Sequence, residues 1–259
     1  MEMSNKNSML KRVISAAIMI PLVIAAIYFG KPYMQILAIT FGGLLAWEWE
    51  YMVNNKRNGI FSIIYAIVMC SSVLLFESMI GMAIILVGAT IITYIKAKTE
   101  KERFLLTLGV PYIFFGIGSL VWLHNEVGYA LTVWYMISVW STDIGGMLVG
   151  CRLKGPKLAP KLSPKKTWSG LLGAMTFASL VSVAFVYLHG EYSYVTFAIL
   201  GALLAVVAQM GDLIESAIKR HLNVKDSSDL IPGHGGVFDR VDGLIFAAPI
   251  VLVFFKFIF

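Results

Sequence analysis

Apolar runs of near membrane-spanning length fill most of this chain of 259 residues. A helix needs about 20 mainly apolar residues to cross a hydrocarbon core about 30 Å thick. Because an open sheet would leave unpaired backbone groups in lipid, such runs are expected to be helices. Nine runs approach the required length: about 13–30, 33–53, 60–76, 79–95, 104–122, 128–150, 169–188, 193–210 and 243–258. We therefore predict an all-α, polytopic integral membrane protein with about nine transmembrane helices.

The composition supports this class. Hydrophobic residues make up 58% of the chain and charged residues 14%, whereas about a quarter of the residues in a soluble domain are charged. The basic residues also orient the spans. With the N-terminus in the cytoplasm, all of the 21 lysines and arginines except Lys31 and Lys256 fall in cytoplasmic segments, as the positive-inside rule requires. We predict a multi-pass protein of the cell (plasma) membrane, with its N-terminus and its polar loops in the cytoplasm. The same rule accounts for the net charge of +6, which therefore gives no support for nucleic-acid binding.

The polar segment 211–243 carries both charge signs between two apolar runs. On a helix that continues from the eighth run, Asp212, Ser216 and Lys219 share one face, and Glu215 lies alongside. Carboxylates on a common face suit Mg²⁺, which takes oxygen ligands and keeps several waters for substrate phosphates. This face is a candidate metal site.

Asp239 and Asp242 stand three residues apart at the entry to the last run and could close the same site from another helix. Two sources of carboxylates are what a two-metal phosphoryl or nucleotidyl transfer needs. The alternative for any single acid is a solvated ion pair with Lys219, Arg220 or Arg240. For the set together we favour a functional site, because charge so close to a bilayer is costly.

The turn 232–236, Pro-Gly-His-Gly-Gly, lies between these acids. Its glycines can adopt positive φ and let backbone N–H groups approach an anion closely. His234 could donate to a phosphate oxygen or titrate near neutrality. A plain loop is the alternative, since a Gly-rich turn alone is a weak signal. The position of the turn between acids makes Gly235 and Gly236 substrate-binding candidates.

A second cytoplasmic loop, 151–168, carries six cations, no acid and three prolines. Its hydroxyl and ammonium groups suit a triphosphate. The candidates are Ser163, Lys165, Lys166 and Thr167. Placed opposite the segment 211–243, this loop could neutralise phosphates while the carboxylates hold metal ions. We therefore expect a single membrane domain over 1–259, with 1–130 as a helical scaffold and 131–259 as the catalytic half.

Three further acids lie in or beside the predicted spans. Asp143, near the cytoplasmic end of the sixth run, is a functional candidate, because a carboxylate within a membrane is costly. Its alternative is a structural partner for a cation such as Arg152. Glu48 and Glu50, at the inner end of the second run, are expected to be interfacial anchors beside tryptophans.

Each polar segment contains a run of residues at fixed spacing. The first, the signature, runs from Ser216-Ala-Ile-Lys-Arg220 through Lys225-Asp226 to Ile231-Pro-Gly-His-Gly-Gly-Val-Phe-Asp-Arg-Val-Asp242. The second is Lys157-Leu-Ala-Pro-Lys-Leu-Ser-Pro-Lys-Lys-Thr-Trp168-Ser-Gly170. Both runs resemble the motifs of one enzyme family, the phosphatidate cytidylyltransferases (CDP-diacylglycerol synthases). The motifs cover roughly the C-terminal half, and residues 1–130 agree only in being hydrophobic spans.

The resemblance implies the reaction CTP + phosphatidate → CDP-diacylglycerol + pyrophosphate, with one or two Mg²⁺ ions, in an all-helical membrane bundle that dimerises. By motif match, Asp212 and Asp239 are metal ligands with Asp242 close by. The catalytic candidates are Lys219, Arg220, Lys225, Asp226 and His234. The substrate-binding candidates are Asp143, Ser163, Lys165, Lys166, Thr167, Ser216, Gly235, Gly236 and Arg240. The expected partners are CTP, a phosphatidate lipid, the membrane and a second copy of the chain, with no nucleic acid.

Two other functions stay open. A related CTP-using lipid kinase, such as a polyprenol kinase, would transfer the γ-phosphoryl group instead of the cytidylyl group. An ion-coupled transporter would use Asp143 and the acid cluster as its ion path. Transporters favour charged or broken helices near the midplane, often in repeated halves. In this chain the charges gather at one face and the sequence shows no repeat, so transport ranks below either enzyme.

Overall fold

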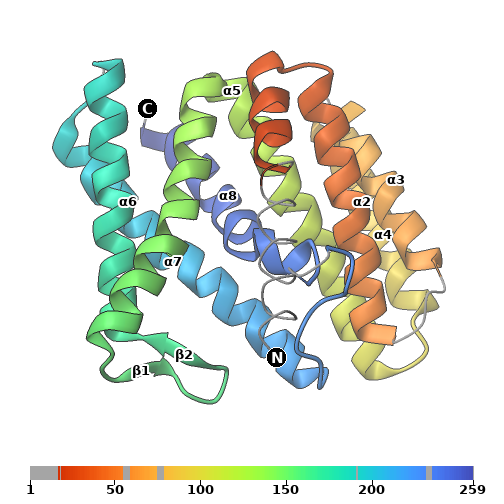
Figure 1. Ribbon diagram of the computed structural model, residues 1–259. Helices are drawn as coiled ribbons and strands as arrows, with labels where there is room; N and C mark the ends of the chain where they lie inside the picture. Colours follow the sequence, from red (N-terminus) through yellow and green to blue (C-terminus); the bar gives the residue numbers. More distant parts are fainter. Residues whose placement is uncertain are drawn as a thin grey trace. The chain divides into compact units, whose positions relative to one another are not determined.

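The computed structural model describes residues 17, 19–54, 59–74, 79–190, 192–231 and 235–258. Helices make up most of this described part, together with one short β-hairpin (Figure 1). The all-α prediction is therefore confirmed, and the hairpin is an addition within the predicted loop 151–168. The chain divides into two compact units. The first takes the described residues up to Glu126 together with Leu222–Val241, and the second takes Val127–His221 together with the residues from Asp242 onward.

The helices of the first unit follow one another closely along the chain. They are an apolar helix Met19–Phe29, α2 (Tyr33–Asn54), α3 (Ile60–Leu74), α4 (Met79–Lys96) and the first part of α5 (Glu100–Leu153). Helix α2 packs on α3, and α3 packs on α4. The indole N–H of Trp49 in α2 donates to the carbonyl of Leu105 over 3.0 Å, and the hydroxyl of Tyr65 in α3 donates to the carbonyl of Leu106. These buried bonds tie α5 to both helices.

Helix α5 contains two of the predicted spans, 104–122 and 128–150. Gly128 interrupts it with a non-helical backbone, φ 84° and ψ 176°. A positive φ of this size is readily adopted by glycine alone, since glycine has no Cβ. The two predicted spans therefore correspond to separate helical segments on either side of Gly128.

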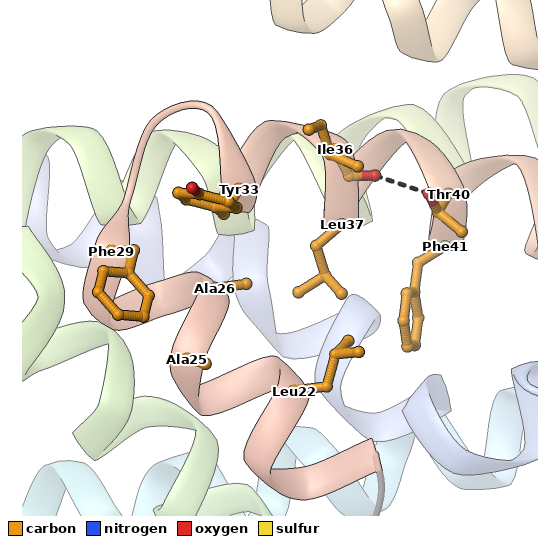
Figure 2. A pocket seen from close by; sticks show the side chains of 9 residues that line it. All are labelled: Leu22, Ala25, Ala26, Phe29, Tyr33, Ile36, Leu37, Thr40 and Phe41. Carbon is orange, nitrogen blue, oxygen red and sulfur yellow. Dashed lines mark hydrogen bonds between the residues drawn. The ribbon is translucent and has the colours of Figure 1, made fainter.

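An apolar hollow of about 660 Å³ lies between the helix Met19–Phe29 and α2. Figure 2 shows the residues that line it: Leu22, Ala25, Ala26, Phe29, Tyr33, Ile36, Leu37, Thr40 and Phe41. The hydroxyl of Thr40 donates to the carbonyl of Ile36 on its own helix over 2.8 Å. The hollow therefore presents mainly hydrocarbon, with no charged side chain in its lining.

The second unit holds the rest of α5, a hairpin and three helices. The hairpin strands are β1 (Lys157–Ala159) and β2 (Ser163–Thr167), and the helices are α6 (Trp168–His189), α7 (Tyr194–His221) and most of α8 (Phe238–Ile258). The strands are antiparallel, with Lys157 opposite Thr167. Helix α6 begins directly after β2, because the side chain of Thr167 accepts a hydrogen bond from the Gly170 backbone N–H over 3.1 Å. Such a bond satisfies one of the free donors at a helix start.

Small residues bring the helices of the second unit close together. A Cβ on Gly145 of α5 would lie 2.7 Å from the carbonyl oxygen of Gly173 in α6. A Cβ on Gly201 of α7 would lie 2.5 Å from the carbonyl oxygen of Ala178 in α6. In Figure 1, α6 and α7 run side by side. Close backbone approach at small residues is typical of helices that associate in lipid, where packing replaces the hydrophobic driving force.

Three helices in the described part are long and apolar enough to cross a membrane: α5, α6 and α7. Large apolar side chains on α6 also stay exposed, with Leu188 at 77% and Leu172 at 62%. Such side chains suit contact with lipid chains. Membrane association is thus supported, while the count of nine spans and their orientation stay predictions.

Candidate active site

Helices α7 and α8 approach each other at two glycines. A Cβ on Gly211 would lie 2.6 Å from the Cβ of Phe246 and 3.0 Å from the backbone oxygen of Asp242. A Cβ on Gly243 would lie 3.0 Å from the backbone oxygen of Ala208. A side chain at Gly211 would force the helices to shift, and one at Gly243 would be a tight fit. Each glycine adjoins an aspartate in the sequence, so the same close approach brings the two aspartates together.

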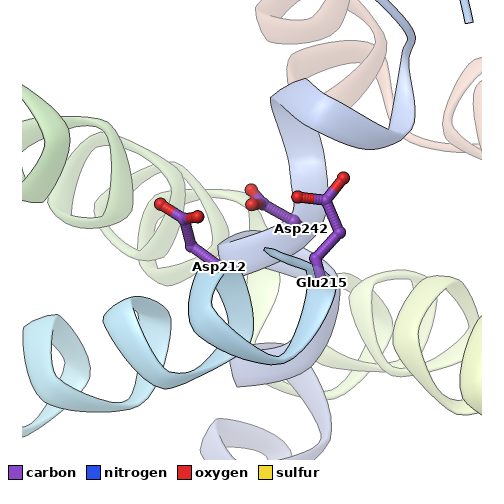
Figure 3. A group of neighbouring side chains, drawn as sticks. All are labelled: Asp212, Glu215 and Asp242. Carbon is purple, nitrogen blue, oxygen red and sulfur yellow. The ribbon is translucent and has the colours of Figure 1, made fainter. Parts of the chain in front are cut away.

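Three carboxylates meet at this crossing. Asp212 and Glu215 of α7 and Asp242 of α8 each offer an oxygen, and these oxygens lie within 4.8 Å of one another. Figure 3 shows the three side chains on their two helices. Glu215 is only 2% exposed. This group, which we name the carboxylate cluster, has the ligand type and spacing that a divalent cation needs.

The ionisation of Asp242 reflects these surroundings. Asp242 precedes the predicted span 243–258. The pKa of the Asp242 carboxyl is raised from 3.8 to about 7. The larger cause is burial, and the second is the negative charge of Asp212. The charge of Asp143 acts in the same direction, against a hydrogen bond from the Gly243 backbone N–H. Burial and like charges both disfavour an ionised carboxylate, and a bound cation would reverse the second effect.

Two lysines neutralise part of the carboxylate cluster. Lys166 of β2 forms an ion pair with Asp212. Lys219, one turn further along α7, forms an ion pair with Glu215 over 2.8 Å. The basic loop and the acidic segment therefore meet at Lys166 and Asp212, as the sequence predicted they could. Successive side chains of a strand point to opposite faces. Lys165, the neighbour of Lys166 in β2, is accordingly exposed.

The other candidates of the second unit lie around this cluster with different partners. The hydroxyl of Ser216 donates to the Oδ1 of Asp212 over 3.5 Å. The hydroxyl of Thr167 caps α6 and lies 3.0 Å from that of Ser169. Asp143 is exposed on α5 and acts on the cluster through its charge. Lys219 and Arg220 lie in the last turn of α7.

Asp239 lies in the first unit and bonds to described residues of 227–238, the part of the signature that we name the signature segment. Its carboxylate accepts hydrogen bonds from the backbone N–H and the hydroxyl of Ser227, both over 3.0 Å, and from the Gly236 N–H over 2.8 Å. The role of Asp239 as a metal ligand therefore stays a prediction from the motif. Lys225, Asp226, Gly235 and Arg240 lie in the same unit, and His234 lies outside the described residues.

The expectation that Glu48 and Glu50 are interfacial anchors is wrong. Glu48 is 0% exposed and Glu50 is 2% exposed. Glu48 accepts four hydrogen bonds from the signature segment. Glu50 accepts from the backbone N–H of Ser62 in α3 over 2.9 Å and from its hydroxyl. Both acids lie at the end of an apolar run, where a charge is costly. The same argument that made Asp143 a functional candidate would therefore have identified Glu48 and Glu50 as candidates.

Sequence comparison with known proteins agrees with this arrangement. Residues 10–258 match the profile of the family described as the Cytidylyltransferase family. The chain belongs to the cytidylyltransferase family. This confirms the family resemblance inferred from the two polar motifs, and membership makes the chain a nucleotidyltransferase.

Several proteins named phosphatidate cytidylyltransferase are similar to this chain along most of their length. A protein of Rickettsia typhi named phosphatidate cytidylyltransferase is 36% identical over 215 residues, which cover 78% of this chain and 94% of that protein. One of the same name from Rickettsia felis is 33% identical over 95% of this chain and 92% of its own length. Another, from Brucella suis, is 31% identical over 94% of this chain and 92% of its own length.

Proposed function

We propose that this cytidylyltransferase transfers the cytidylyl group of CTP to phosphatidate, which gives CDP-diacylglycerol and pyrophosphate for phospholipid synthesis. The observation that carries the proposal is the ion pair between Lys166 and Asp212. It sets a cationic strand against a carboxylate cluster, and a triphosphate needs both cationic groups and a metal-binding site. The names of the similar proteins support phosphatidate as the acceptor.

The chemistry needs no nucleophilic side chain. The phosphate of phosphatidate is itself an anionic nucleophile, and one of its oxygens would attack the α-phosphorus of CTP. The new bond joins that oxygen to the α-phosphorus, and the bond from the α-phosphorus to the bridging oxygen breaks, so pyrophosphate leaves. The barrier is the repulsion between two anionic substrates. Positioning and charge neutralisation are what the protein must supply.

The carboxylate cluster fits a divalent cation, because three carboxylate oxygens lie within 4.8 Å of one another. Burial first, and then repulsion from Asp212, raise the pKa of Asp242, and a cation would offset the repulsion. Asp212, Glu215 and Asp242 would hold Mg²⁺, and Asp239 stays a further proposed ligand from the motif. The ion would supply positive charge for the phosphates. Lys166 and Lys219 already hold Asp212 and Glu215 in place, and both ammonium groups could also turn to a phosphate oxygen.

The remaining parts of the proposal follow from the sequence. The triphosphate would lie along the hairpin with Ser163, Lys165 and Lys166, and the Gly235–Gly236 turn would approach a phosphate. The site would face the cytoplasm at the inner leaflet of the plasma membrane, where lipid can arrive from the side and CTP from the cytosol. We expect the enzyme to act as a homodimer.

Labelled CTP tests the proposal against the lipid kinase. The purified protein is mixed with phosphatidate in detergent micelles, Mg²⁺, and CTP labelled at the α- or the γ-phosphate. Cytidylyl transfer moves only the α-label into lipid and releases pyrophosphate. Transfer of the γ-label into lipid with release of CDP would instead show a kinase and refute the proposal.

A further inference from the structure

Glu48 is a buried carboxylate whose hydrogen bonds all come from one segment of the chain. It lies in α2, within an apolar helix, and is 0% exposed. Its Oε1 accepts from the hydroxyl of Ser228 over 2.5 Å and from the backbone N–H of Val237 over 2.8 Å. Its Oε2 accepts from the hydroxyl of Ser227 over 3.3 Å and from the backbone N–H of Phe238 over 2.6 Å. Hydrogen bonds to an ionised group are about twice as strong as neutral ones.

The four donors lie at the two ends of the signature segment 227–238. Two are serine hydroxyls at its start, and two are backbone N–H groups where α8 begins. One side chain from a distant helix therefore joins Ser227 and Ser228 to Val237 and Phe238. Asp239 also links the two ends of the segment, because its carboxylate accepts hydrogen bonds from Ser227 at the start and from Gly236 near the end. The two carboxylates share the hydroxyl of Ser227 as a donor.

The space around these bonds is filled. A Cβ on Gly236 would lie 1.8 Å from the Oγ of Ser227 and 2.6 Å from the Oε1 of Glu48. The ring of Phe238 lies 5.5 Å from that of Trp49 and 6.0 Å from that of Tyr112, between ring centroids. Trp49 follows Glu48 directly in α2. Aromatic packing and hydrogen bonding thus fix the start of α8 to the same point of α2.

We infer that Glu48 is a positioning residue that holds the signature segment, and with it the carboxylate of Asp239, in the shape that cytidylyl transfer requires. The inference rests on the proposed function for its catalytic consequence. Glu48 acts through the Ser227 hydroxyl and the backbone N–H groups of Val237 and Phe238. The motif residue Asp239 directly follows Phe238 and also accepts from Ser227, so its position depends on these bonds.

The chemistry of the donors predicts what a neutral replacement does. In Glu48→Gln one oxygen becomes an NH₂ group, which cannot accept. A serine hydroxyl can turn and become the acceptor, but the backbone N–H of Val237 or Phe238 cannot. One buried N–H would face another donor, and leaving such a group unsatisfied is costly. Replacing this one oxygen by NH₂ should therefore weaken the hold on the signature segment without removing volume from the core.

Glu50→Gln is the matched control, because Glu50 is the next acid on α2 and just as buried. Within the described part of the chain its bonds go to Ser62 of α3 and not to the signature segment. Hydrogen–deuterium exchange by mass spectrometry on the full-length protein in micelles compares both variants with the wild type. For Glu48→Gln we expect exchange in peptides covering 227–238 to be about tenfold faster, and kcat to fall with KM for CTP unchanged. For Glu50→Gln we expect unchanged exchange in those peptides.

Two results would overturn the inference: unchanged exchange over 227–238 in Glu48→Gln, or equal acceleration in Glu50→Gln. If Glu48→Gln does not accumulate as folded protein, Ser228→Ala decides, because it removes a single donor and the acceptor of the Leu230 N–H. Leu230 itself is expected to exchange faster in this variant. Faster exchange at Val237 and Phe238, whose N–H groups donate to Glu48, then supports the inference, and unchanged exchange there overturns it. If the wild-type protein did not turn over CTP and phosphatidate, the proposed function would be refuted. The exchange comparison would still decide whether Glu48 holds the signature segment in place.

Discussion

Lys166 of the β-hairpin forms an ion pair with Asp212 of α7, whose carboxylate belongs to a cluster of three. The lysine side chain is 17% exposed and that of the aspartate 31%, so the pair is partly shielded from water. It joins two residues that are 46 positions apart in the chain, one from each polar segment. A cation that lies against a carboxylate of this cluster would be in position to contact a phosphate, if the triphosphate binds where we propose.

Replacing Lys166 should weaken the use of CTP. Lys166→Ala removes a charge-assisted contact to phosphate, worth about 1.5–3 kcal/mol, so kcat/KM for CTP should fall roughly 10- to 100-fold. Steady-state kinetics with varied CTP measure this. The control is Lys161→Ala, an exposed lysine in the hairpin turn, for which we expect kinetics close to wild type. Equal losses in both variants would show that total loop charge, and not the position of Lys166, matters.

The close approach of α7 and α8 should depend on Gly211. In Gly211→Ala the new Cβ would meet the Cβ of Phe246 at 2.6 Å, so the helices must separate and the carboxylate cluster must widen. Overpacking of this kind costs about 1–3 kcal/mol, so both the melting temperature in detergent and the turnover should fall. Gly88→Ala is the control, because its Cβ would meet nothing within 4 Å. Normal turnover in Gly211→Ala would refute the link between helix spacing and activity.

The raised pKa of Asp242 predicts a dependence of stability on pH. Its pKa is about 7 in the fold against 3.8 as the reference value, so the native state binds a proton that the unfolded state has lost. Stability from this group is therefore present below about pH 4 and declines as pH rises through 7. Metal-free wild-type protein should therefore lose thermal stability between about pH 4 and 7, the interval between the two pKa values, and change little above it. Asp242→Asn should lack that part of the slope, and an identical slope would contradict the raised pKa.

Both polar segments should lie on the cytoplasmic face. Single cysteines introduced as Lys161→Cys and Asp229→Cys, with Cys70 and Cys151 changed to serine, can be mapped with a membrane-impermeant thiol reagent. We expect both to react in inverted vesicles and neither in right-side-out vesicles. Reaction of the two cysteines from opposite sides of the membrane would rule out a shared site.

Much of the architecture could be predicted because apolar runs and helices share their boundaries. Helix α7 extends from the eighth predicted span to His221, as the face shared by Asp212 and Ser216 required. The hairpin was missed because its strands, Lys157–Ala159 and Ser163–Thr167, are short, rich in lysine and proline, and lack an apolar alternation. Its register depends on the turn and on the capping of α6 by Thr167, neither of which has a clear sequence pattern.

The candidate site was predicted only in part, for a physical reason. Asp212 and Asp242 meet because glycines beside them let two helices touch, and the motif marked both residues. The role of Glu48 could not be read from the motif, because its partners lie about 180 residues further along the chain. Two of those partners are backbone N–H groups, which no residue type identifies. The cost of burying a carboxylate was the one available signal.

The most direct test is lipid labelling by Asp212→Asn beside Glu100→Gln, an exposed acid at the start of α5. All proteins are incubated with α-labelled CTP, phosphatidate micelles and Mg²⁺. Wild type and Glu100→Gln should form labelled lipid that requires Mg²⁺ and is lost with a chelator. Asp212→Asn should remain folded and membrane-bound but lose on the order of 100-fold or more of the rate. Mg²⁺-dependent labelling of lipid by Asp212→Asn at the wild-type rate would contradict a catalytic centre at the carboxylate cluster.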